Sequence, residues 1–194
     1  MPRVGRVLAS HISKANFPMA TTKKTKAAKA AGRTDRMPSS APGSTDAIAL
    51  LEADHREVDG YFNAFEAATG DAEKKTIADK ICLALKVHTQ IEEELFYPPA
   101  REKTGDGDLL DEALVEHSGA KILIAQIEAM LPGQPLYDAK VKVLAEQVRH
   151  HVEEEETELF PETREANLDL QALGVKLAAR KAELMQQLAP VPVA

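Results

Sequence analysis

The feature that most constrains this chain is an internal repeat. The segment HTQIEEELFYP at residues 88–98 recurs 63 residues later as HVEEEETELFP at residues 151–161. In both copies a His is followed four residues on by a Glu, and the copy closes with an aromatic residue and a Pro. The segments DHREV and EHSGA repeat at an offset of 62 and carry His55 and His117. The chain is therefore two copies of a two-helix unit, with one His of this pattern on each helix.

Apolar residues recur along these units with the spacing of helices that are buried on one face. We expect four helices, at about residues 46–68, 71–97, 108–131 and 136–160. The second should stop at Pro98 and the fourth at Pro161, because proline breaks a helix interior. A further apolar stretch, at about residues 168–188, predicts a terminal helix on the outside of the bundle or on a partner chain. Short connections make successive helices antiparallel, so the predicted fold is an all-α, up-down-up-down four-helix bundle with an extra C-terminal helix.

The histidines fall at matching places in the predicted helices. Two lie roughly ten residues after a helix start, and two lie ten residues before a proline stop. In an up-down-up-down bundle these places share one end, so all four imidazoles are expected at one level. Each His continues the apolar stripe of its helix, and a Glu four residues beyond a His points the same way. The predicted inward polar residues are His55, His88, Glu92, His117, His151 and Glu155.

This set of side chains predicts bound metal. Six polar groups inside an apolar core are costly unless something satisfies them, and two divalent or trivalent cations would do so. Imidazole offers a neutral nitrogen ligand, and carboxylate offers charge and can bridge two ions. Nitrogen and oxygen ligands without thiolate suit iron, manganese or zinc and exclude iron–sulfur and Cu(I) sites. The inward residues contain no Glu-x-x-His pair, which distinguishes the pattern from ferritin-like di-iron bundles.

The order His…His-x-x-x-Glu…His…His-x-x-x-Glu, with DH and EH in the first and third helices, resembles the hemerythrin-like (HHE cation-binding) domain. The resemblance covers about residues 46–161. It implies a non-haem centre of two iron ions (Fe2+ or Fe3+) that an oxo or hydroxo group can bridge, with Glu92 and Glu155 as bridging carboxylates. Relatives bind dioxygen, handle peroxide or nitric oxide, or sense oxygen or iron. The implied remaining ligands are His55 and His88 for one iron, and His117 and His151 for the other.

One position departs from the oxygen-carrying hemerythrins, which have a fifth His one turn beyond the place of His117. This chain has Lys121 there. More positions on iron would then be open, which argues against a simple reversible oxygen carrier. It favours a centre that reacts with oxygen or peroxide, or one that merely holds iron. Asp59 follows His55 at the equivalent place, and we expect Asp59 and Lys121 to meet as a buried ion pair that floors the site.

Other polar residues near the pattern are expected either to support it or to lie in solvent. Asp54 and Glu116, each directly before a His, are candidate acceptors for imidazole N–H groups or else surface charges. His150 is expected at the surface or behind the ligands. Glu154 and Glu158 lie near the inward face as spare candidate ligands. The tyrosines have no distinguishing context.

Composition bounds the surroundings of the protein. The chain is 44% hydrophobic, has no apolar run long enough to span a membrane, and holds a single cysteine, Cys82. We therefore expect a soluble, cytoplasmic protein without a secretory signal, in which Cys82 is an inert core thiol.

Charge divides the chain unevenly. Residues 1–36 hold nine Lys/Arg and one acidic residue, although the whole chain has a net charge of −7. We expect residues 1–44 to be a disordered basic tail, residues 45–165 to be the bundle, and residues 166–194 to be the C-terminal helix and tail. We expect this tail to be solvated. Two alternatives are that it contacts nucleic acid or anionic lipid, or that it serves as an organelle transit peptide.

Three classes of function stay open at this point. The first is a di-iron protein that acts on oxygen or peroxide in oxidative or nitrosative stress. The second is a non-catalytic module that carries or senses oxygen, nitric oxide or iron. The third is a structural bundle that takes up metal incidentally. The expected partner is a small ligand (oxygen, peroxide or nitric oxide), with no specific nucleic acid and no membrane, in a monomer or weak homodimer. The residues do not decide whether a substrate is turned over.

Overall fold

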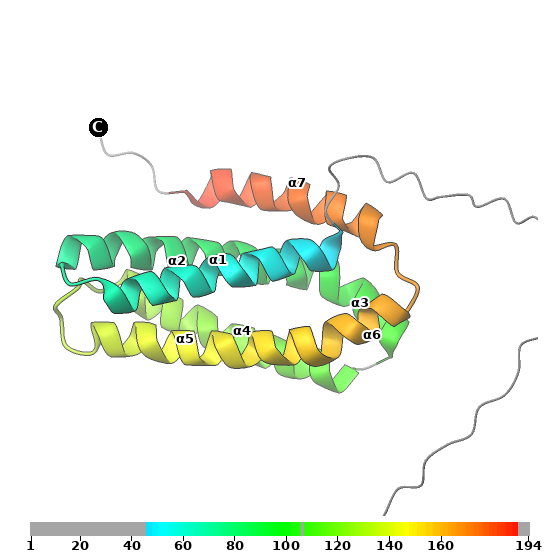
Figure 1. Cartoon of the computed structure of the whole chain (residues 1–194), viewed down its shortest axis with the longest axis horizontal. Helices are drawn as coiled ribbons and strands as arrows, with labels where there is room; N and C mark the ends of the chain where they lie inside the picture. The colour runs from blue at the N-terminus through cyan, green and yellow to red at the C-terminus, as the bar shows by residue number, and fades with distance from the viewer. Residues whose placement is uncertain (1–45, 106, 190–194) are drawn as a thin grey trace, which may run out of the picture. The chain divides into compact units, whose positions relative to one another are not determined.

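The structure is a computed structural model that describes residues 46–105 and 107–189. Within these residues the chain forms helices joined by short connections (Figure 1). The elements are α1 Ala47–Ala67, α2 Asp71–Ile91, η1 Glu92–Phe96, α3 Tyr97–Thr104, α4 Gly107–Glu128, α5 Tyr137–Glu154, η2 Glu155–Leu159, α6 Phe160–Glu165 and α7 Leu170–Leu188, where η marks π-helix. The predicted basic tail, residues 1–44, lies outside the described residues.

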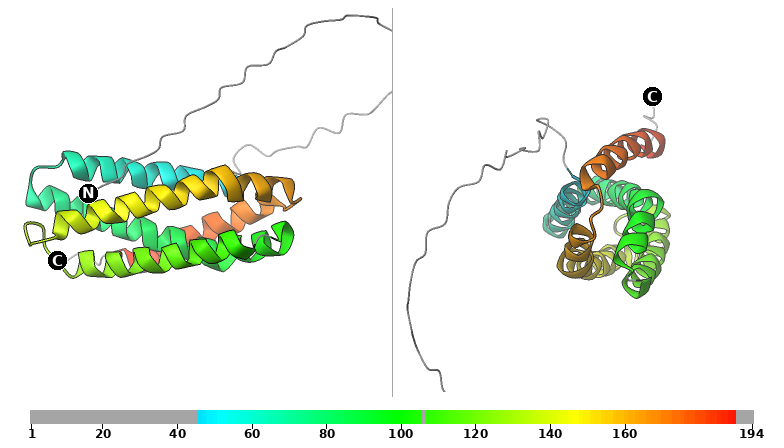
Figure 2. Two further views of the ribbon diagram at one scale, coloured as in Figure 1. Left: turned by 90° about the horizontal axis from the view of Figure 1, so that it is seen from below. Right: turned by 90° about the vertical axis from the view of Figure 1, so that its right-hand side faces the viewer.

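The long helices α1, α2, α4 and α5 run antiparallel in chain order and enclose one core (Figures 1 and 2). α1 packs against α2 and α5, and α4 packs against α5 and α2, so α1 and α4 lie on one diagonal. This confirms the predicted all-α, up-down-up-down bundle. None of the described helices combines the length and the apolar character that a membrane crossing requires.

Local sequence determines where several of these helices begin and end. The Asp46 carboxylate accepts a hydrogen bond from the Ala49 N–H at 2.8 Å and caps α1. Asp169 caps α7 in the same way, with the Ala172 N–H at 2.9 Å. α3 ends at Gly105, whose φ of 76° is a left-handed conformation that favours glycine.

The predicted helix stops at the two prolines are wrong. The helical path continues past Pro98 as α3 and past Pro161 as α6, because a π-helical turn precedes each proline. In η1 the Tyr97 N–H donates to the Glu92 C=O, five residues back. In η2 the Phe160 N–H donates to the Glu155 C=O in the same way. α-Helical bonding then restarts with the proline in its first turn, where its missing N–H is not needed.

Two apolar clusters fill the bundle on either side of a polar layer. The first includes Ile48, Leu51, Ile91, Phe96, Leu110 and Leu159. The second includes Phe62, Ile81, Leu85, Ile124, Leu144 and Val148. Cys82 lies buried in the second cluster, and burial raises the pKa of its thiol to about 12, which fits the predicted unreactive core thiol.

The C-terminal helix belongs to the first cluster. Leu173, Leu177 and Leu184 of α7 are buried there, and α7 packs against α1, α2 and η1 (Figure 2). Of the two placements that the sequence allowed, α7 therefore takes the one on the outside of its own bundle.

Candidate metal centre

The six inward polar residues predicted from the repeat come together between the two apolar clusters. Four of them are imidazoles, one from each long helix, and two are the carboxylates that begin η1 and η2. All have 7% or less of their surface exposed, so the layer is closed to bulk solvent. The residues are His55, His88, Glu92, His117, His151 and Glu155.

The imidazoles approach one another in pairs through their Nε2 atoms. His55 Nε2 lies 3.2 Å from His88 Nε2, and His117 Nε2 lies 3.1 Å from His151 Nε2. Two ligand atoms bound at right angles to one ion, each at about 2.1 Å, are separated by roughly 3 Å. The spacing within each pair therefore fits a shared cation.

The two carboxylates lie between the imidazole pairs. Glu92 Oε2 is 3.2 Å from His88 Nε2 and 3.4 Å from His117 Nε2. Glu155 Oε2 is 3.3 Å from His55 Nε2 and 3.6 Å from His151 Nε2. Each carboxylate thus contacts one imidazole of each pair. Potential ligand atoms gather in two groups that share Glu92, namely His55, His88, Glu92 and Glu155, and Glu92, His117 and His151.

Buried atoms in this layer fit bound cations. Both carboxylate oxygens of Glu92 and Oε2 of Glu155 are buried and make no hydrogen bond. A carboxylate held in that condition is costly, because desolvation opposes its charge. Cations at this place would satisfy the carboxylates and the facing Nε2 lone pairs together.

Two further glutamates orient imidazoles from behind. Glu93 Oε1 accepts a hydrogen bond from His117 Nδ1 at 2.9 Å, and Glu156 Oε1 accepts one from His55 Nδ1 at 2.9 Å. Such bonds fix the proton on Nδ1 and leave Nε2 free for a metal. Sequence reasoning missed both residues. Each directly follows the inward Glu of its repeat copy, which is the signal that would have found them.

Asp54 and Glu116 directly precede His55 and His117 in the sequence. Each lies near the Nδ1 atom of an imidazole on a neighbouring helix. Glu116 Oε2 accepts a hydrogen bond from His151 Nδ1 at 2.8 Å. Asp54 Oδ2 lies 3.6 Å from His88 Nδ1, which is too long for a hydrogen bond. The predicted role as acceptor is thus met by Glu116 and only approached by Asp54.

Burial and neighbouring charges set the protonation of the centre without metal. Burial by itself would lower the pKa of His88, but Glu92 and Asp54 outweigh it and raise the pKa to about 10. Burial would raise the pKa of Glu92, yet His88 and His117 hold that pKa well below its usual range. A bound cation takes the place of such protons, so metal binding at this site releases them.

The two halves of the centre differ at one aromatic position. Tyr97 is 3% exposed; its hydroxyl donates to Glu155 Oε1 at 2.9 Å and lies 3.2 Å from His117 Nε2. Burial, followed by the neighbouring carboxylates, raises the pKa of Tyr97 well above 10, so the phenol stays a donor. Phe160, 63 residues on, stacks on His55 with ring centroids 5.7 Å apart. Sequence reasoning missed Tyr97, although aligning the two copies places it opposite a residue without a hydroxyl.

A small cavity adjoins the centre on the side of the second apolar cluster. It has a volume of about 20 Å³ and touches all four imidazoles. Val58, Leu85, Ala120 and Val148 line its apolar wall. This volume exceeds what one water molecule requires, so a molecule of two or three atoms fits.

The predicted buried ion pair between Asp59 and Lys121 is wrong. Lys121 Nζ binds Glu93 Oε1 at 2.6 Å, and Asp59 Oδ1 binds Arg149 Nε at 2.8 Å. The side chains of Lys121 and Asp59 are 45% and 49% exposed. The inward-facing residues of each helix are spaced three or four positions apart. The next inward residue after His55 is Val58 and after His117 is Ala120, each three positions on. Positions four residues on therefore turn toward the surface.

Two residues named as spare candidate ligands lie outside the inner layer. Glu158 is exposed. Glu154 Oε1 lies 3.4 Å from His150 Nε2, and His150 is exposed, as predicted. With Glu116 these two residues form a separate group of potential metal ligands at the surface.

Known proteins of similar sequence identify the family. The family model described as the hemerythrin HHE cation binding domain matches residues 46–163, more than half of the chain. The chain belongs to this family. The matched range contains all six inward residues of the HHE protein, and the cation-binding character of the domain agrees with the centre described above.

Two individual relatives of this HHE protein are informative. A hemerythrin HHE cation binding domain-containing protein of Mycobacterium kansasii has a solved structure that matches with a TM-score of 0.65 and 22% identity. The match covers 74% of this chain and 89% of that one, and it supports the fold. A DNA nickase of Nostoc sp. is 29% identical over 141 residues. That match covers 72% of this chain but 40% of the nickase, so the HHE protein spans well under half of that relative's length.

Proposed function

We propose that this HHE protein holds two iron ions and reacts with or binds oxygen or peroxide, in the handling of oxidative or nitrosative stress. One iron would be bound by His55 and His88 and the other by His117 and His151, with Glu92 and Glu155 bridging. The observation that carries the proposal is the buried layer of facing ligand atoms, gathered in two groups that share Glu92. Bound iron would supply redox chemistry and open positions for a small ligand.

The choice of iron rests on the resemblance to the hemerythrins together with the donor chemistry, and the choice of a small ligand rests on the space available. The layer offers nitrogen and oxygen donors and no thiolate, a set that suits iron. The adjoining cavity of about 20 Å³ has room for oxygen, peroxide or nitric oxide and is too small for larger substrates. The Tyr97 hydroxyl reaches into the same layer, where it donates to Glu155 and holds that carboxylate in place.

Metal analysis and a peroxide assay test the proposal. Protein expressed in iron-replete medium should contain two irons per chain, and Glu92→Ala should lose most of them. Glu158→Ala removes an exposed carboxylate from the other copy of the repeat and should keep both irons. One ion per chain, or zinc alone, would refute the di-iron assignment.

The peroxide assay separates reaction from storage. Consumption of many peroxide molecules per iron supports a reacting centre. Consumption that ends after one equivalent per centre supports the alternative, a non-catalytic carrier or sensor of oxygen, nitric oxide or iron.

The relative from Nostoc favours a second candidate, which is action on DNA. Residues 1–36 carry nine Lys/Arg and one acidic residue, a composition that attracts phosphates. The iron-loaded full chain should then convert supercoiled plasmid to open circles, with an activity that declines steeply with salt and is lost in Glu92→Ala. Intact plasmid at low salt would exclude this candidate.

The surroundings of the protein are part of the proposal. We infer a cytoplasmic location, a monomer or weak homodimer, and a bundle domain at residues 45–165 flanked by the basic tail and the C-terminal helix. The only cysteine of the chain, Cys82, is a buried free thiol, as suits a reducing compartment. Light scattering of the purified protein tests the oligomeric state.

A further inference from the structure

The two halves of the bundle differ in what lies outside them. On the α1–α2 half, apolar residues at four-residue spacing belong to the cluster that α7 completes: Leu83, Val87, Ile91 and Leu95. At the repeat offset of 63, the corresponding residues of the other half are Glu146, His150, Glu154 and Glu158. The first stripe explains why α7 packs where it does. The second is polar and open to solvent in the described part of the chain.

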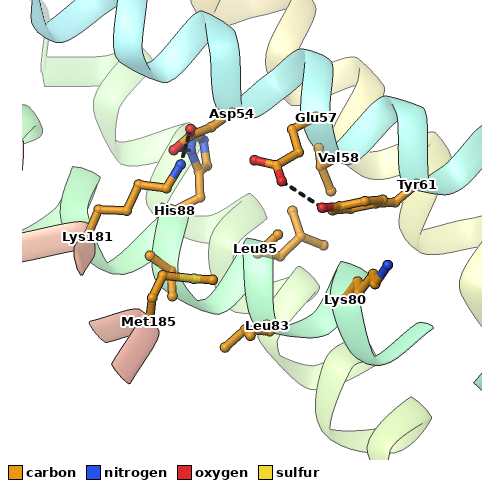
Figure 3. Close-up of a pocket in the computed structure, with 12 residues that line it drawn as sticks. Asp54, Glu57, Val58, Tyr61, Lys80, Leu83, Leu85, His88, Lys181 and Met185 are labelled. Carbon is orange, nitrogen blue, oxygen red and sulfur yellow. Dashed lines mark hydrogen bonds and ion pairs between the residues drawn. The ribbon is translucent and has the colours of Figure 1, made fainter. Parts of the chain in front are cut away.

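Asp54 lies beside the imidazole of His88, and Glu116 lies beside the imidazole of His151. The two carboxylates differ in the residue that contacts them from the surface. On the covered half, Lys181 of α7 binds Asp54, and the two side chains line a pocket beside His88 (Figure 3). On the open half, Glu116 holds the equivalent place. Its Oε2 binds His151 Nδ1 at 2.8 Å, and its Oε1 lies 3.9 Å from Nε2 of the exposed His150.

Glu116, His150 and Glu154 gather into a group that fits a metal ion. One ligand atom from each lies within 4.8 Å of the others, and His150 Nε2 is 3.4 Å from Glu154 Oε1. The His150 side chain is 62% exposed, whereas those of Glu116 and Glu154 are 21% and 25% exposed. An imidazole nitrogen with two carboxylates, drawn from two helices, is a donor set that divalent first-row metals accept.

We propose that these three residues form a loading site, which captures Fe2+ from solution and delivers it to the buried centre. This inference rests on the proposed function. The inner ligands are 7% exposed or less, so iron has to pass a surface layer to reach them. Glu116 contacts both sides of that layer, because its two oxygens face the surface His150 and the inner ligand His151. An ion held at the surface group is therefore one side chain away from the inner centre.

Metal-filling kinetics test the loading site, with Co2+ alone as the probe and the metal-free full chain as the sample. The double variant His150→Ala, Glu154→Gln should fill the inner centre roughly tenfold more slowly, which corresponds to an activation free energy about 1.4 kcal/mol higher. Its final metal content should equal that of the parent. Glu153→Gln removes a neighbouring exposed charge outside the group and should fill at the parental rate. Stopped-flow absorption follows the rate, and elemental analysis gives the content.

The outcomes separate this inference from the proposed function. Equal filling rates in parent and double variant would overturn the loading site. So would a final metal content that falls together with the rate, because the two residues would then support the inner centre itself. If the parent fails to hold two ions, the proposed function fails instead. A weak extra equivalent of Co2+ in the parent that is lost in the double variant would support the surface site directly.

Discussion

Replacing Tyr97 by Phe tests how the hydroxyl in the polar layer contributes to the fold. Phe160 already occupies the equivalent place in the other half, so a phenyl ring fits such a position. Tyr97 donates to the buried Glu155 carboxylate at 2.9 Å. A hydrogen bond to a charged group contributes about 1.5–3 kcal/mol, so the metal-free variant should lose about that much free energy of unfolding. Each kcal/mol lowers the melting temperature of a domain this size by about 2–4 °C, which predicts a fall of about 3–12 °C.

Tyr137→Phe is the matched control for this experiment. Tyr137 is 1% exposed, and its hydroxyl is buried without a hydrogen-bond partner. Deleting that hydroxyl should leave stability unchanged or raise it, because no bond is lost. Thermal melts of chelator-treated protein at neutral pH, followed by circular dichroism, compare the two variants. Equal melting temperatures would refute the assigned contribution of Tyr97. In metal-loaded protein the loss should shrink, since a cation then stabilises the Glu155 carboxylate.

Three further predictions concern the centre and the C-terminal helix. In metal-free protein the pKa of His88 is raised from 6.5 to about 10, so its stabilising contribution is complete below about pH 6.5 and disappears as the pH rises toward 10. The melting temperature should fall across this window, and less so in His88→Gln. Glu92→Ala should lose more metal, by elemental analysis, than His55→Ala, because the carboxylate lies between both imidazole pairs; the reverse order would remove its bridging role. Leu177→Ala should lower the free energy of unfolding in urea by about 2–5 kcal/mol, since Leu177 is 0% exposed. Val175→Ala, at a 58% exposed position of the same helix, should change it by less than about 0.5 kcal/mol.

Much of the fold and of the candidate site could be predicted from the repeat. Copies of a two-helix unit at offsets of 62 and 63 require equivalent helices, and short connections require antiparallel neighbours. The four histidines stand at equal distances from helix ends, so a bundle must bring them to one level. The structure brings together these four residues with Glu92 and Glu155, at separations of 3.1 to 3.6 Å.

The side-chain contacts between helices could not be predicted from the repeat. Glu93 and Glu156 face histidines on other helices, and their partners depend on which helices are neighbours and how each is rotated. The misplaced Lys121 shows the same limit from within one helix. A period of 3.6 residues leaves steps of three and four both plausible, and only packing against the neighbouring helices selects one.

Sequence by itself determined the helical class, the doubled unit, the inward polar residues and the donor chemistry of the centre, because helical periodicity links spacing along the chain to one face of each helix. Tertiary structure decided the π-helical turns at Glu92 and Glu155, the approach of the Tyr97 hydroxyl, and the side of the bundle that α7 covers. Those features depend on how residues far apart in the sequence pack against one another. The stripe that ends at Leu95 accepts α7, and its polar counterpart leaves the group around His150 open to solvent, a difference that exists only once the helices are assembled.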